Sequence, residues 1–219
     1  MSILSFFPTQ IDHSKKVAPP SLNRDLIREI SQLQEMDRAG ADWSKQNYFA
    51  GYTSYGSLDK LHLSSPNFAE LEKHIKPKVA AFARVLEWDI QPYKLKMNSC
   101  WVNVMPQGAH HSFHIHPGSV ISGTYYVEVP KTSSPLKFED PRLSKMMLAP
   151  QKKVKCKAHN KTHIEIFSQS RDLILFESWL RHEVPANRVK NDRISVSFNS
   201  VFDAFDSALK ISLYDLLAR

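Results

Sequence analysis

The second half of the chain is a series of short segments rich in β-branched and aromatic residues, separated by turns. By number, these segments are 101–104, 120–129, 136–138, 163–167, 173–177 and 194–201. Runs of this length and composition are typical of an antiparallel sandwich or barrel. The sequence therefore predicts a mainly β core over about residues 94–201.

The first part of the chain has helical periodicity instead. Apolar residues recur at helical spacing over residues 23–36, which predicts a first helix there. A second helix is expected to begin near Asn67, where Asn67 and Glu70 fit a capping box, and Pro77 should kink or split it. Residues 37–64 look irregular, and residues 203–217 suit a short helix or an edge strand. We expect one domain over residues 1–219, with helical support over about 1–93.

Composition excludes several classes of protein. No apolar run approaches the roughly 20 residues of a membrane span, so no membrane partner is expected. Cys100 and Cys156 are too few for a disulfide framework, which favours a cytoplasmic protein. The net charge of +7 owes much to lysines within residues 152–161. No aromatic residues interleave these lysines, so nucleic acid is not an expected partner and a solvated loop is the simpler interpretation. A homodimer is compatible with the sequence.

Two of the predicted strands carry a polar face. In the last strand, Arg193, Ser195, Ser197 and Asn199 alternate with apolar residues, and the segment 122–128 has a similar polar face. Such faces either lie in water or line the mouth of a barrel, while the apolar faces pack beneath the helices. An arginine on the same face as small hydroxyls favours the second interpretation.

Histidines are concentrated at one point of the chain. His114 and His116 are two residues apart, so on a strand both would point to one side and could hold one ion. His182, at the end of an apolar strand, is the best candidate for a third ligand. His110 and His111 lie on a predicted loop and could compete. Imidazoles suit iron, zinc, copper or nickel, and three protein ligands leave open positions of the kind that catalysis requires.

Several short motifs carry a resemblance to a known family. They are F-F-P-T at 6–9, G-Y-T-S at 51–54, W-V-N at 101–103, H-I-H-P-G-S at 114–119 continuing to Val127, F-E-D-P-R at 138–142, S-W-L-R-H-E-V at 178–184 and R-I-S-V-S-F-N at 193–199. Together they span nearly the whole chain. In this combination the chain resembles a small bacterial and phage family of 2-oxoglutarate-dependent Fe(II) oxygenases.

The resemblance implies a double-stranded β-helix, a jelly-roll or cupin-like barrel, and a role for each motif residue. The three histidines of the predicted metal site would bind Fe(II). Arg193 would form a salt bridge with the distal carboxylate of 2-oxoglutarate, because a guanidinium pairs with a carboxylate through two hydrogen bonds. Ser195 and Tyr126 would add hydrogen bonds to this cosubstrate, and Asn103 would hold substrate or cosubstrate.

The implied activity is that of a dioxygenase that uses Fe(II), 2-oxoglutarate and O2. It would hydroxylate an unidentified small molecule or peptide and release succinate and CO2. Loops over residues 37–64 and 141–162 are expected to cover the site and to select the substrate. One departure from the wider superfamily is His116, which stands where most members have a carboxylate ligand. This leaves open whether His116 binds the metal directly.

Two alternatives remain at this point. Gly108 followed after five residues by His114 and His116 matches the front half of a cupin motif, but the glutamate that should follow is missing. A cupin-type metalloenzyme would not use 2-oxoglutarate and would give Arg193 no purpose. The second alternative is a non-catalytic binding protein that retains a vestigial metal site on the same barrel.

Overall fold

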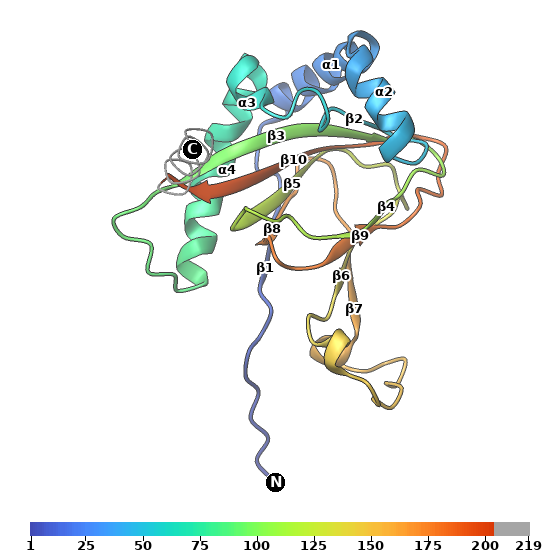
Figure 1. The fold of residues 1–219 in the computed structure, drawn as a ribbon. Coiled ribbons are helices and arrows are strands. Elements are labelled where there is room, and N and C mark those ends of the chain that lie inside the picture. Colours follow the sequence, from blue (N-terminus) through green and yellow to red (C-terminus); the bar gives the residue numbers. More distant parts are fainter. Residues whose placement is uncertain (204–219) are drawn as a thin grey trace, which may run out of the picture.

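The computed structural model describes residues 1–203, and Figure 1 shows its mixture of helices and antiparallel strands. The elements in chain order are β1 (Ile11–Ser14), α1 (Pro20–Met36), α2 (Arg38–Asn47), β2 (Tyr52–Thr53), α3 (Leu61–Ser64), α4 (Pro66–Val85), β3 (Leu95–Met105), β4 (His111–His114), β5 (Ile121–Glu128), β6 (Leu136–Glu139), β7 (His163–Ile166), β8 (Leu173–Glu177), β9 (His182–Val184) and β10 (Arg193–Phe202). The segment 203–217, for which a helix or an edge strand was expected, lies almost wholly outside the described residues.

The strands form two antiparallel sheets. The larger has the order β1-β8-β5-β10-β3-β2, and the smaller has the order β4-β9-β6-β7. Apolar side chains from both sheets form a common cluster that includes Met105, Phe138 and Phe176, so the sheets face each other. The prediction of a mainly β core is confirmed. Over residues 1–203, however, the strands do not join into one closed cylinder.

The helices cover the other face of the large sheet, as Figure 1 shows. Leu26 of α1 and Phe68 of α4 are fully buried in one cluster with Val196 and Phe198 of β10. The alternate residues of β10 therefore face the helices, and its polar residues face the smaller sheet. The period-two pattern thus predicted the direction of these side chains. Glu128, at the end of the polar face of β5, is exposed.

The first part of the chain departs from expectation at three points. Residues 37–64 are ordered rather than irregular, and contain α2, β2 and α3. The cap of α4 is Ser65, whose hydroxyl accepts a hydrogen bond from the N–H of Phe68, while the Asn67 amide donates to Glu29. A proline at the first helical position supports this earlier start. Of the two outcomes expected at Pro77, the split does not occur: α4 continues through it as one helix, because hydrophobic packing along the helix outweighs the lost backbone hydrogen bond.

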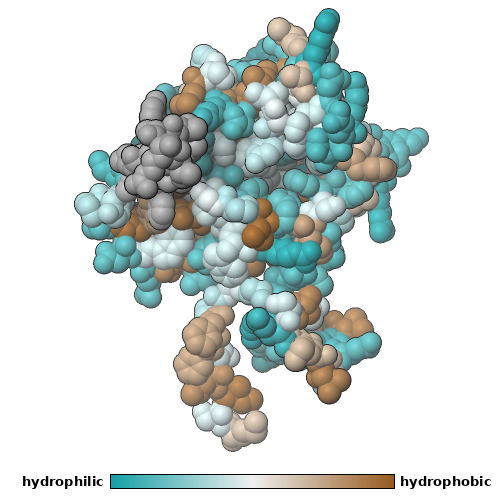
Figure 2. Space-filling model, viewed as in Figure 1, coloured by the Kyte–Doolittle hydropathy of each residue, from teal (hydrophilic) through white to brown (hydrophobic). Residues whose placement is uncertain are grey.

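The chain between β6 and β7 projects away from both sheets. Its lysines are exposed, as expected for a solvated loop, and so are Met147, Leu148 and Val154. Figure 2 shows hydrophobic side chains on this projection and on the extended N-terminal segment.

Among residues 1–203, no helix has both the length and the hydrophobicity that a membrane crossing requires. Cys100 is buried and Cys156 is partly buried, and both are free thiols.

Candidate metal and anion site between the sheets

The pairing of β4 with β9 brings His114 and His182 together. His114 is the last residue of β4 and His182 is the first residue of β9, and the two are direct partners in the ladder. Their ring centroids are 4.2 Å apart. Phe176 of β8 packs its ring 4.5 Å from the ring of His182 and holds it from the side of the large sheet. Backbone pairing therefore unites two residues that are 68 positions apart.

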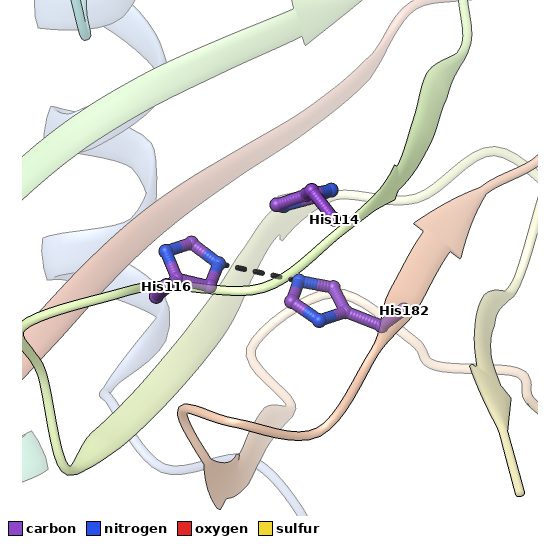
Figure 3. A group of neighbouring side chains, drawn as sticks. All are labelled: His114, His116 and His182. Carbon is purple, nitrogen blue, oxygen red and sulfur yellow. Dashed lines mark hydrogen bonds between the residues drawn. The ribbon is translucent and has the colours of Figure 1, made fainter. Parts of the chain in front are cut away.

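His116 joins this pair from a loop. Strand β4 ends at His114, so the two histidines do not share a continuous strand as the spacing had suggested. The Nε2 atoms of His116 and His182 are nevertheless 3.3 Å apart, which Figure 3 shows as a dashed line. One ligand nitrogen from each of the three histidines lies within 4.8 Å of the other two. Two imidazoles that bind one ion at about 2.1 Å stand roughly 3.0–3.4 Å apart, so His116 and His182 are already at coordination distance.

The other ring nitrogens of two histidines are engaged by the backbone. The Nδ1 atom of His182 lies 2.9 Å from the carbonyl oxygen of Leu180, and the Nδ1 atom of His114 lies 2.8 Å from that of Ser112. When Nδ1–H donates to a carbonyl, the lone pair is on Nε2. This arrangement fixes both the tautomer and the ring orientation that metal coordination requires.

Burial keeps these imidazoles neutral. Desolvation, reinforced by the neighbouring His114, lowers the pKa of His116 to about 4. The same cause holds the pKa of His182 well below its usual value, and burial also lowers the pKa of His114. A neutral imidazole is the form that binds a metal ion. The three rings are therefore ready to act as ligands at neutral pH without losing protons.

A fourth histidine lies beside the three. His111 was expected on a loop, but it is the first residue of β4 and pairs with Val184 of β9. Its ring stacks on His114 at 4.1 Å, and burial lowers its pKa to about 3. A register irregularity between His111 and His114 turns both rings to the same side, which a regular strand would not do at this spacing. His110, by contrast, packs against Phe49.

Arg193 lies in the cavity that the histidines line. The cavity is partly open to solvent, and its wall includes the three candidate ligands together with Arg193 and Ser195. The Arg193 side chain is only 1% exposed, with its guanidinium 4.9 Å from the ring of Tyr126 and Nη1 against the sulfur of Met105. Its Nε and Nη2 atoms have no hydrogen-bond partner, and it forms no ion pair within residues 1–203. A buried cation of this kind calls for an anion.

The remaining predicted residues divide into two groups. Ser195 and Asn103, which are direct partners across β10 and β3, line the cavity, and the Asn103 amide donates to the hydroxyl of Ser197. Tyr126 is fully buried behind Arg193 and is not part of the cavity wall, and burial raises the pKa of its hydroxyl. Ser168 and Arg193 lie close enough to this hydroxyl to offset part of the rise in its pKa, although no hydrogen bond of good geometry reaches it from the described residues.

Sequence reasoning missed Tyr48 as a wall residue. It follows α2 in the segment that was expected to be irregular, yet it is buried, lines the cavity and packs edge-on against His111. Trp101, which was noted only as part of a motif, also lines the cavity, 6.0 Å from the ring of His116. The segment 37–64 therefore does reach the site, as expected, through Tyr48. The half-exposed Tyr55 also packs against Trp101.

The residues fit a metal ion with an adjoining anion. Three neutral imidazoles on one side of a cavity form an open coordination set, and a structural site would instead be closed by four ligands. The unpaired donors of Arg193 lie in the wall of the same cavity and fit a carboxylate. A ligand with a metal-chelating end and a distal carboxylate would satisfy both features.

Comparison with known proteins leads to the same chemistry. Residues 99–199 match the family model described as "Putative 2OG-Fe(II) oxygenase". No curated protein sequence matches the chain significantly. The matched segment runs from β3 to β10 and contains all three histidines and Arg193.

Solved structures of low sequence identity share the fold. The epimerase SnoN, solved with Fe3+, alpha ketoglutarate and nogalamycin RO, is 15% identical over 88% of this chain and 79% of its own, with a TM-score of 0.62. A Pseudomonas putida prolyl-4-hydroxylase is 12% identical over 87% of this chain and 92% of its own, with a TM-score of 0.60. HygX from Streptomyces hygroscopicus, with nickel and 2-oxoglutarate bound, is 12% identical over 88% and 82%, with a TM-score of 0.58.

The fold of the chain is therefore the double-stranded β-helix of these proteins, with its two sheets packed face to face. Residues 99–199, which carry the three histidines and Arg193, match the family model of the 2OG-Fe(II) oxygenases, and this segment is therefore similar to that family.

Proposed function

We propose that the protein hydroxylates a small molecule or a peptide in a reaction that consumes 2-oxoglutarate and O2 and yields succinate and CO2. The observation that carries this proposal is the buried guanidinium of Arg193, with two unpaired donors, in the wall that also holds three neutral imidazoles. Bound Fe(II) and 2-oxoglutarate would together supply the oxidising chemistry, and the protein would position and shield the reactants.

Each residue has a distinct role in this proposal. His114, His116 and His182 hold the iron from one side of the cavity and leave positions open on the other. Arg193 holds the distal carboxylate of 2-oxoglutarate through two parallel hydrogen bonds. Ser195, next to Arg193 on the polar face of β10, adds a hydrogen bond to the same group.

The roles of Tyr126 and Asn103 are narrower. Because the ring of Tyr126 packs against Arg193 from behind and lies outside the cavity wall, we assign it to orienting the guanidinium in place of the expected hydrogen bond to the cosubstrate. Asn103 is held by Ser197 with its side chain in the cavity wall, which suits a contact with cosubstrate or substrate. Trp101 and Tyr48 keep water away from the reacting centre.

The titration that tests this proposal is anaerobic. Fe(II) is added to the protein first and 2-oxoglutarate second, and the visible charge-transfer band of the chelate is followed. A band that saturates at one equivalent of each supports the proposal. Iron binding without any response to 2-oxoglutarate would favour the cupin-type alternative, and no iron binding would favour a non-catalytic barrel.

The cellular setting and the substrate complete the proposal. Two free thiols, one of them buried, are consistent with a protein of the cytoplasm. The cavity is open to solvent and lined by aromatic residues together with a few polar groups, as is common for sites that bind small molecules or single side chains. Formation of succinate in the presence of candidate substrates, measured against 2-oxoglutarate consumed without substrate, identifies the class that couples to turnover.

A further inference from the structure

His116 needs support that the sheet does not provide. It lies two residues beyond the end of β4, outside every strand. Its backbone N–H donates to the carbonyl of Ser178 at 3.0 Å, and the N–H of Ser178 donates to the carbonyl of Val120, also at 3.0 Å. The backbone of Ser178 therefore bonds to the loop 116–120 at both of its ends.

Ser178 also opens the turn that carries His182. Strand β8 ends at Glu177, and the N–H of Leu180 donates to the carbonyl of Glu177 at 2.9 Å to close the turn. The carbonyl of Leu180 is in turn the partner of His182 Nδ1. One residue thus contacts the two segments that present His116 and His182, whose Nε2 atoms must both reach one ion.

The side chain of Ser178 anchors this junction to the large sheet. Its Oγ lies 2.7 Å from Oγ of Ser122, and the Ser122 hydroxyl donates to Oδ1 of Asn199 at 2.8 Å. A hydroxyl has one proton, so Ser178 must donate to Ser122. Ser122 and Ser178 are each 1% exposed and Asn199 is 8% exposed. The chain of hydrogen bonds runs from the turn through β5 to β10, where Asn199 borders a bulge against β3.

We propose that Ser178, Ser122 and Asn199 form a positioning device, here named the hydroxyl clamp, that sets the separation of the His116 and His182 imidazoles and so determines the metal affinity and the coordination geometry. This inference rests on the proposed function, because it assumes that these imidazoles bind one ion. The clamp residues are positioning residues and are not assigned as metal ligands.

Removing one member of the clamp should lower the metal affinity more than the stability of the fold. In Ser178→Ala, the backbone bonds of residue 178 to His116 and Val120 remain, and Ser122 keeps its bond to Asn199. The turn loses only its tether to the large sheet, so His116 and His182 are less strongly held at coordination distance. Outer partners that orient metal ligands typically change metal affinity by about 10- to 100-fold when they are removed, and we expect a loss in this range.

Co(II) alone is the probe, because its visible d–d spectrum reports coordination geometry without turnover. Wild type, Ser178→Ala and a control, Ser65→Ala, are titrated, and their thermal unfolding is measured without metal. The control removes a similarly buried hydroxyl that caps α4 in the helical layer. We expect Ser65→Ala to lower stability with wild-type Co(II) affinity and spectrum, and Ser178→Ala to weaken binding and to alter the band positions.

A double-variant cycle tests whether the clamp acts as a unit. If Ser178 acts through Ser122, the two losses should not add. The double variant, with both serines changed to Ala, should then have the same Co(II) affinity as whichever single variant has the lower affinity. Wild-type affinity and spectrum in Ser178→Ala, or fully additive losses in the double variant, would overturn the clamp while leaving the metal site intact. A wild-type protein that binds no Co(II) would overturn both the clamp and the proposed function.

Discussion

Replacing Arg193 by Met should greatly weaken the binding of 2-oxoglutarate but change the free energy of unfolding little. The reason is that the buried guanidinium would bind a ligand and contributes little to the stability of the fold. Methionine has a similar length and no charge. In wild type without ligand, the Nε and Nη2 donors have no partner, so the folded protein bears the desolvation of two unsatisfied groups. Exchanging a buried ion pair for apolar side chains of similar volume is often neutral or stabilising by about 1–4 kcal/mol, and a buried charge without a partner should give up no more when it is removed.

Some of that gain is offset by contacts that the variant loses. The guanidinium packs on the ring of Tyr126 at 4.9 Å, and a desolvated cation–π contact contributes up to about 2 kcal/mol. The metal-free variant should therefore unfold with a free energy within about 2 kcal/mol of wild type. Its affinity for 2-oxoglutarate should fall far more, because truncating one partner of a buried charge pair costs about 2–5 kcal/mol, or roughly 30- to 4,000-fold.

The assay combines two measurements. Urea unfolding of the metal-free proteins gives stability, and anaerobic calorimetry of 2-oxoglutarate into the metal-loaded proteins gives affinity. The control is Arg181→Met, which removes a half-exposed arginine that pairs with Glu139 on the outer face of the smaller sheet. It should leave 2-oxoglutarate affinity unchanged. The reasoning is refuted if Arg193→Met binds 2-oxoglutarate as wild type does, or if it is destabilised by much more than 2 kcal/mol.

Three further predictions follow from the same structure. His116→Ala should reduce Co(II) affinity by at least about 100-fold, because its Nε2 is at coordination distance from that of His182, and a loss below threefold would place it outside the coordination sphere. The unfolding free energy of metal-free protein should fall as the pH drops from about 6.5 toward 4. Burial lowers the folded-state pKa of His116 to about 4, so the unfolded state binds more protons in that window, and stepped-pH urea titrations check this. Phe68→Ala, in the fully buried core beneath the helices, should cost about 3–5 kcal/mol in thermal unfolding yet leave Co(II) affinity at 10 °C unchanged.

The parts of the fold that the sequence predicted correctly are those with a regular hydrophobic pattern, of period two in strands or 3.6 in helices. Alternation along residues 193–199 put Arg193 and Ser195 on one face, and the presence of an arginine among small hydroxyls favoured the interior for that face, where both residues do lie. The helix over residues 23–36 was also correct apart from its start. Short elements were missed: β9 has three residues and β2 has two, too few for any periodicity to be visible.

The candidate site shows a second limit. The sequence grouped His114 with His116 on the assumption of a continuous strand, and the two do converge, but through a loop held by hydrogen bonds from Ser178. His111 was expected on a loop as a possible competitor, and its place in β4 was missed because no residue pattern predicts the irregularity that turns it toward His114. Tyr48 was missed because its contact with the site depends on how α2 packs, which is a long-range property.

The position of the site follows from this difference between regular and irregular structure. The large sheet is long, buried on both faces and fixed in register, so it presents Arg193 and its neighbours on a rigid surface. The smaller sheet has strands of only three or four residues, and two of the three candidate metal ligands lie at strand ends there. Short strands supply few ladder bonds, so we infer that side-chain hydrogen bonds to the large sheet add to the backbone contacts that orient the ligands. This is why the buried Ser122 and Asn199 face the cavity side, where apolar residues would pack as well but would hold nothing in place.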